Sequence, residues 1–167
     1  MATGLKSRII YRTHVEDTSK ENYWAGTYKL LMKAKSIPSP FGSANMVDTS
    51  TLEDLVETQE AGRRSAASME VPGAFEKKYK DEMAANEGKK LDFCILYGTD
   101  GKGSEGICAF IGTESFAPDE ATSDHLTGTA TVAVSTVPRW IEDNYTVTVV
   151  EDENGYPTEI TLVAKSA

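Results

Sequence analysis

Three glycines between two apolar runs are the first residues whose spacing suggests chemistry. In "YGTDGKGSEGICAFIG", Gly101, Gly103 and Gly106 form the pattern G-x-G-x-x-G. This pattern binds dinucleotides only where a strand leads into the glycines and a helix starts from them, because helix N–H groups must face the pyrophosphate. A strand is expected over 91–97, but the residues after Gly106 are β-branched and aromatic and have no helical period. Asp-Gly between two apolar runs instead predicts a hairpin turn and no nucleotide site.

Two further clusters contain residue types that occur in catalytic and metal sites. They are His125 with Asp124, Ser123 and Ser135, and His14 with Glu16 and Asp17. Neither has a nucleophile elbow or an H-E-x-x-H spacing, and both lie in polar, loop-like segments. Solvent-exposed histidines are the simpler interpretation. The sequence therefore predicts no enzyme, no bound metal and no cofactor.

Cys94 and Cys108 lie on the two arms of the predicted hairpin, equally far from Gly101. A register centred on Gly101 would set them opposite each other. The N-terminal segment has no uninterrupted apolar core, so we expect folding in a cytosol, where thiols stay reduced. The expectation is two reduced, half-buried cysteines, too few for a metal site.

The charge of the chain is unevenly distributed. Its 167 residues are 40% hydrophobic and 26% charged, as is usual for one globular domain. Residues 1–102 hold 15 Lys/Arg and 15 Asp/Glu, whereas residues 103–167 hold 2 and 11, so the net charge of −9 belongs to the second part. This distribution argues against a surface that grips nucleic acid and permits one that repels it. An acidic face that serves solubility is the alternative.

Turn signals and apolar runs predict a mostly β chain of about seven to nine strands, a β-barrel or sandwich with one packed α-helix. The expected strands are 27–35, 65–71, 91–97, 106–116 and 125–137, followed by a hairpin over 145–164. The helix is expected over 74–87, with Phe75, Tyr79 and Met83 on one face and Gly88 at its end. Between the first two strands, the polar segment 42–64 predicts a long extended arm, and a compact domain rarely carries so long a connection without a use.

The order of these parts resembles the major tail tube proteins of long, flexible-tailed (siphovirus-type) bacteriophages. The resemblance covers Tyr28 to about Val137, roughly two thirds of the chain. A strand ends in the Ser-Ile-Pro turn at 36–38, and an extended segment follows with a Thr-rich stretch, "TSTLED" at 49–54. Then come a strand, a single helix, and a hairpin with an Asp-Gly turn at Asp100-Gly101.

This resemblance implies a β-barrel subunit over 25–137. The residues outside the resemblance are expected to form an N-terminal arm over 1–24 and a C-terminal hairpin extension over 138–167. The resemblance implies that hexameric rings stack into a tube in the virion tail, assembled in the host cytoplasm, through which DNA is ejected without specific binding. The other implied partners are tape-measure, tail-tip and tail-terminator proteins. The expected subunit contacts are Ile37, Phe41, Met46, Asp48, Thr51, Leu52, Asp54, Arg63 and Arg64. The expected lumen-lining residues are Glu105 and Glu114.

Other functions fit the same pattern. The nearest is a type VI secretion-like tube protein, which differs mainly in its cargo. A second is an immunoglobulin-like binding module displayed on a particle, which predicts a monomer, whereas a tube protein predicts polymerisation. A small cytosolic enzyme ranks last, because no catalytic constellation supports it.

Overall fold

The computed structural model describes residues 6–16, 19, 21–41, 44–48, 59–64, 68–123 and 126–165, with 44–48 and 59–64 described as backbone. The main sheet is built from β1 (Arg8–Thr13), β2 (Gly26–Leu30), β5 (Ser68–Ala74), β6 (Leu91–Tyr97), β7 (Gly106–Pro118), β8 (Thr127–Val134), β9 (Arg139–Trp140), β10 (Tyr145–Glu151) and β11 (Pro157–Ala164). The remaining elements are β3 (Ala44–Asp48), β4 (Gln59–Arg64) and the helix α1 (Lys77–Asn86). Among the described residues, no helix is long and apolar enough to cross a membrane.

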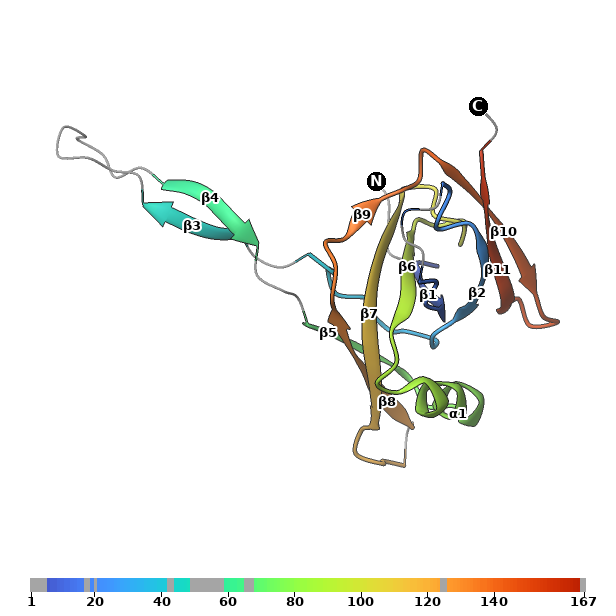
Figure 1. Ribbon diagram of the computed structural model, residues 1–167. Coiled ribbons are helices and arrows are strands. Elements are labelled where there is room, and N and C mark those ends of the chain that lie inside the picture. Colours follow the sequence, from blue (N-terminus) through green and yellow to red (C-terminus); the bar gives the residue numbers. More distant parts are fainter. Residues whose placement is uncertain are drawn as a thin grey trace, which may run out of the picture.

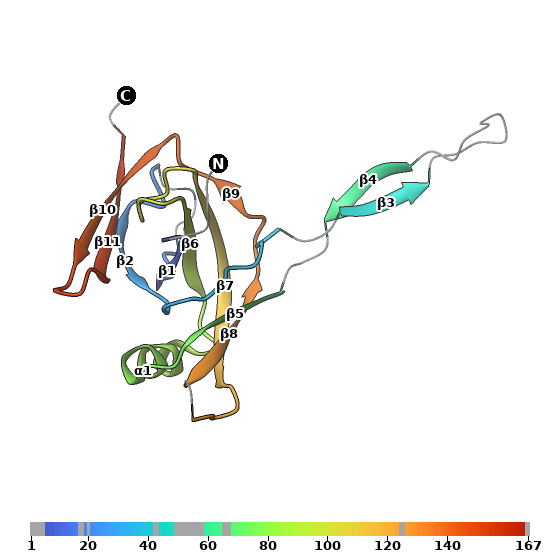
Figure 2. The ribbon, with the colours of Figure 1, turned by 180° about the vertical axis from the view of Figure 1, so that it is seen from behind.

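The main sheet is antiparallel and curls into a barrel (Figures 1 and 2). Its strands follow the order β10-β11-β2-β1-β6-β7-β8-β5, and β9 pairs with β7. The chain just after β2 meets the far edge strand β5, where Ala34 bridges Gly73. Backbone hydrogen bonds run there from Lys35 N to Pro72 O (2.8 Å) and from Ala74 N to Lys33 O (3.1 Å). The mostly β fold with one packed helix is thus the one that the sequence predicts.

β1 lies in the middle of the sheet, which differs from the expectation of an N-terminal arm over 1–24. It pairs with β2 on one side and along its whole length with β6 on the other. Ile9 and Ile10 are fully buried in the core. The C-terminal hairpin is joined to the same sheet, since β11 pairs with β2.

The glycine-rich segment turns a hairpin, as the sequence predicts. β6 and β7 pair antiparallel from Tyr97↔Gly106 onward, and no helix follows Gly106. Gly101 and Gly103 have φ values of 74° and 76°, which glycine adopts without strain. The geometry that binds a dinucleotide is not formed at these glycines, because a strand rather than a helix follows them.

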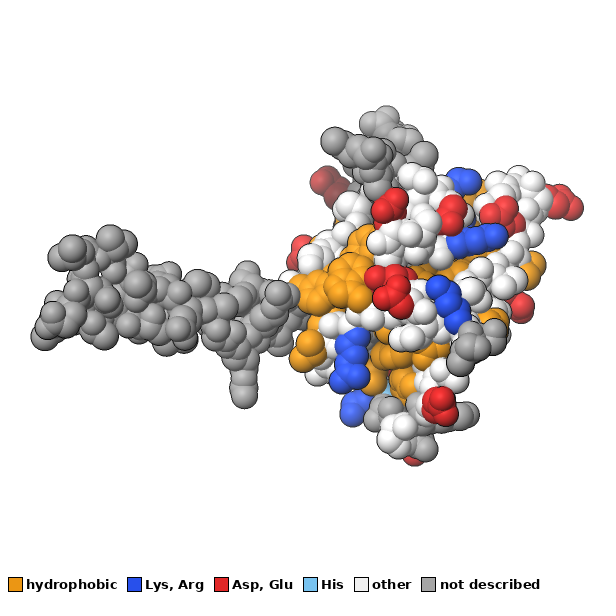
Figure 3. Space-filling view, turned by 90° about the horizontal axis from the view of Figure 1, so that it is seen from above, with side chains coloured by type: hydrophobic (Ala, Val, Ile, Leu, Met, Phe, Trp, Pro, Cys, Tyr) orange, Lys and Arg blue, Asp and Glu red, His pale blue; other side chains and the backbone are white. Residues whose placement is uncertain are grey.

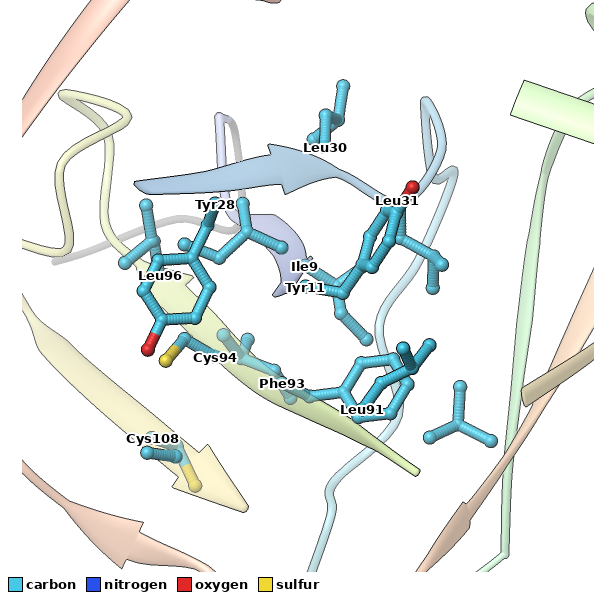
Figure 4. Packing of buried hydrophobic residues seen from close by; sticks show 14 of the residues in the cluster. Ile9, Tyr11, Tyr28, Leu30, Leu31, Leu91, Phe93, Cys94, Leu96 and Cys108 are labelled. Atoms are coloured by element: carbon cyan, nitrogen blue, oxygen red, sulfur yellow. The ribbon is translucent and has the colours of Figure 1, made fainter. Parts of the chain in front are cut away.

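The predicted register of this hairpin is wrong by one residue. Cys94 pairs with Ala109 and Cys108 with Ile95, because the connection between the paired strand ends holds eight residues instead of an odd number. Both cysteines are free and fully buried rather than half-buried. Figure 4 shows both sulfur atoms within the hydrophobic cluster, and burial raises the pKa of the Cys108 thiol to about 12. Two unreactive core thiols follow.

α1 closes one end of the barrel (Figure 1). Tyr79 and Met83, one turn apart, are buried, which confirms two residues of the predicted apolar face. The third, Phe75, precedes the helix and is half-buried. The helix begins three residues later than expected, because Pro72 and Gly73 belong to β5 and pair with β8. Glu76 therefore precedes the helix, and its carboxylate binds Lys33 Nζ at 2.8 Å.

β3 and β4 form a separate two-stranded hairpin within the predicted arm. They pair with each other with a register shift between Ala44 and Met46, and neither makes an extensive contact with another described element. In both ribbon views this hairpin projects away from the barrel (Figures 1 and 2). An isolated hairpin is at best marginally stable in water, so contacts beyond its own two strands would stabilise this arm.

Candidate assembly interface

The expected contact residues fall on the arm and at its root. Met46 and Asp48 belong to β3, and Arg63 and Arg64 to β4. Thr51, Leu52 and Asp54 lie outside the described residues. Ile37 and Phe41 are half-buried on the barrel side of the arm.

Aromatic residues gather where the arm meets the barrel. The Phe41 ring stacks on Trp140 with centroids 5.6 Å apart, and Tyr97 lies 5.7 Å from Trp140 on a tilted ring. Trp140 nevertheless stays 54% exposed and the nearby Val137 75% exposed. Figure 3 shows hydrophobic side chains spread over this face of the molecule. Exposed apolar area of this kind marks an interaction surface.

A pocket of about 470 Å³ opens beside these residues. One wall is the turn Asn22–Trp24, and the other is the chain from Thr136 to Arg139. Ile111 and Tyr145 complete the lining. Arg139 is exposed and has no ion pair with any residue in the described part of the chain. We call this cavity the Arg139 pocket.

A buried polar network fixes the first wall of the Arg139 pocket. Asp92 is 0% exposed and accepts hydrogen bonds from Arg12 Nε (2.9 Å) and from the hydroxyl of Tyr23 (2.9 and 3.0 Å), while His14 Nδ1 lies 2.8 Å from its second oxygen. Arg12 also donates to the carbonyls of Tyr23 and Ala25. Burial and the neighbouring Asp92 raise the pKa of Tyr23 to about 12, so its hydroxyl stays a donor. The turn that carries Trp24 is therefore rigidly held.

The second wall is fixed by the backbone. Arg139 in β9 pairs with Ala109 in β7, and Ile141 N donates to Ile107 O at 2.8 Å. On the other side, Ile111 N donates to Thr136 Oγ1 at 3.0 Å. Arg139 thus projects from a short strand that β7 holds at both ends.

The two candidate lumen residues have different surroundings. Glu105 is exposed in the connection between β6 and β7. Glu114 is only 3% exposed, and neither carboxylate oxygen has a hydrogen-bond partner within the described part of the chain. Burial, with a smaller contribution from Glu87, raises the pKa of Glu114 to about 7. The side chain of Glu114 lies inside the subunit, so it cannot line a lumen. Glu105 remains the lumen candidate.

The structure describes only some of the residues that could do chemistry. His14 is bound to Asp92, while His125 and Asp124 lie outside the described residues. Among described residues, no group of three or more His, Cys, Asp or Glu side chains is placed to hold a metal ion.

One long strand edge of the barrel is open. β10 pairs only with β11 on one side, and its residues alternate between Thr and Val over Thr146–Val149. Open edges of this type pair readily with another chain. In the described part of the molecule, β10 and the arm therefore offer unused backbone hydrogen-bonding groups.

These elements define a closed β-barrel with one capping helix and a projecting arm. A solved structure with a similar fold is the tail of an empty GTA particle, determined by helical refinement with C6 symmetry. The match has a TM-score of 0.56 and 16% sequence identity, and it covers 81% of this chain and 95% of that one. No family model and no curated protein sequence matches the chain.

Sequence reasoning missed the Arg139 pocket. Its walls come from segments near 22–24, 111, 136–139 and 145, which are brought together only by the barrel. The one available signal was Arg139 itself, one of two basic residues in the acidic part of the chain.

Proposed function

We propose that this protein is the structural subunit of a bacteriophage-type tail tube, in which hexameric rings stack into a conduit for DNA. The observation that carries the proposal is the tail tube fold shared with a C6-symmetric tail, together with an arm that has no extensive contact with its own barrel. A subunit with an open strand edge and an unpartnered arm is complete only in an assembly. The subunit does no catalysis and acts by polymerising.

Ring closure and stacking use different surfaces in this proposal. Lateral contacts between barrels close the ring and cover the open edge of β10. Contacts along the tube are head-to-tail and do not close, so they grow into a filament. The arm, including Met46, Asp48, Arg63 and Arg64, makes the contact along the tube.

The same proposal places the protein in the tail of a siphovirus-type particle, assembled in the bacterial cytoplasm. Tape-measure, tail-tip and tail-terminator proteins are its partners there. The acidic second part of the chain, with Glu105 as the first candidate, faces the lumen and repels DNA phosphates.

The test is electron microscopy of the purified full-length protein over a range of concentrations. We expect tubes with a central channel and sixfold averages in end-on views. A protein that stays monomeric at every concentration, in the presence of a preformed tail tip as well as without it, contradicts the proposal and favours a displayed binding module.

A further inference from the structure

We infer that the Arg139 pocket receives the acidic tip of the arm, residues 51–57, from another copy of this chain. This inference rests on the proposed function and names the receiving surface for the arm. It assigns a role to a cavity of about 470 Å³ and to an arginine that has no ion pair with the described residues of its own subunit.

The charges of the two surfaces are complementary. Residues 36–62 contain no Lys or Arg and five acidic residues, namely Asp48, Glu53, Asp54, Glu57 and Glu60. Arg139 is exposed and has no ion pair with the described residues. A guanidinium group binds a carboxylate through two parallel hydrogen bonds, which fixes orientation as well as charge.

The apolar parts are also complementary. The tip "TLEDLVE" places Leu52, Leu55 and Val56 among its acids. The pocket offers Trp24 and Tyr145 beside the 75% exposed Val137. Its volume of about 470 Å³ lies within the range of about 300–1,000 Å³ that binding pockets occupy.

The occupant comes from a second copy because of the direction of the arm. The ends of β3 and β4 that residues 49–58 connect lie at the end of the hairpin farther from the barrel in both views (Figures 1 and 2). The pocket lies on the barrel, against β7 and β10. A neighbouring subunit in a stack brings its own pocket to the arm.

A second basic groove is the alternative acceptor. It lies between β2 and α1, is lined by Lys29 and Lys78, and has a volume of about 160 Å³. This groove also contains Glu82, which repels an acidic segment. Its smaller volume and mixed charge favour the Arg139 pocket.

Charge reversal tests the electrostatic contact. Arg139→Glu and the arm variant Glu53→Lys/Asp54→Lys should each raise the critical concentration for tube formation by at least about tenfold, or about 1.4 kcal/mol. Combining the two should restore it to within about threefold of the unmodified protein, because opposite charges face each other again. Lys29→Glu is the matched control and should leave it unchanged. Failure of the combined variant to recover, or loss of assembly in Lys29→Glu, overturns the inference.

Disulfide trapping tests proximity directly. The native cysteines are fully buried, so an engineered pair on the surface reacts alone. Leu55→Cys with Val137→Cys should give intermolecular cross-linked ladders in oxidised tubes, whereas Leu55→Cys with Val150→Cys should not. Tubes that form without the first ladder overturn the docking site and leave the tube function intact. Absence of tubes from the unmodified protein refutes the proposed function and the docking site with it.

Discussion

At the scale of single residues, the described core contains a carboxyl group that has no hydrogen-bond partner, that of Glu114. Glu114 faces the buried side of β7, is 3% exposed, and has no hydrogen-bond partner in the described part of the chain. Glu87 raises its pKa further. A buried group of this kind costs stability whenever it is ionised.

The sign of the pH effect follows from the raised pKa of Glu114. Its ordinary value is 4.5 and its folded value about 7, so the folded state holds the proton more tightly than the unfolded state. The folded state therefore loses stability as pH rises from about 4.5 to about 7, and by about 3 kcal/mol in all. Below this window the carboxyl is neutral in both states.

We expect Glu114→Gln to be more stable than the unmodified protein at pH 8, by up to about 3 kcal/mol, and nearly equal to it at pH 4.5. The free energy of unfolding from urea titrations at both pH values measures this. Glu105→Gln, an exposed carboxyl in the same half of the chain, is the control and should show no such pH dependence. Equal stability of the Glu114 variant and the unmodified protein at pH 8 contradicts the assignment.

At the scale of elements, the sequence predicts those turns and helices that a few neighbouring residues determine. Asp-Gly and Asn-Gly predict both hairpins, and Asp152 accepts hydrogen bonds from Asn154 N (2.9 Å) and Tyr156 N (3.0 Å) in the second turn. The spacing of Tyr79 and Met83 predicts the helix. These patterns depend on contacts between residues a few positions apart, so the structures that they predict are found in the folded chain.

The errors arise where distant segments decide the outcome. The register of β6 against β7 depends on the parity of the loop, which composition does not reveal, and one residue changes the face of every side chain. The central position of β1 depends on pairing with β6, about eighty residues later. The same limit hid the Arg139 pocket, because four separate segments line it.

The arm gives the prediction at this scale. Deletion of residues 46–60 should leave a folded subunit whose melting temperature changes little, because β3 and β4 make no extensive contact with the rest of the described barrel. The same deletion should abolish tube formation. Calorimetry measures the melting temperature, and electron microscopy measures tube formation. A deletion variant that still stacks into tubes would show that the arm is not part of the assembly contact.

At the scale of the whole molecule, the acidic second part of the chain affects DNA passage through the proposed tube. A bore lined with carboxylates repels phosphates, and salt screens this repulsion within about 10 Å at 0.1 M. A bore with added lysines gains contacts that weaken steeply with salt. In the proposed tube, the charge of the lumen therefore sets how strongly DNA is held in transit.

We expect Glu105→Lys to give tubes that assemble but retain DNA at low salt and release it at high salt. Co-sedimentation of linear DNA with tubes at about 50 and 200 mM salt measures this retention. Glu120→Lys, which changes an exposed acid beyond the end of β7, is the matched control. If the two variants retain equal amounts of DNA, Glu105 does not line the lumen. The acidic second part of the chain then serves solubility.

The isolation of the arm from its own barrel also determines when growth begins. In a proposed hexameric ring, six arms point along the tube together and meet six acceptors at a high effective concentration. A single contact with a dissociation constant of about 1 mM, or about 4 kcal/mol, leaves two lone subunits apart, but six such contacts share one loss of rotational and translational freedom. Free subunits therefore stay dispersed until a complete ring exists, and that ring is the nucleus from which the tube elongates.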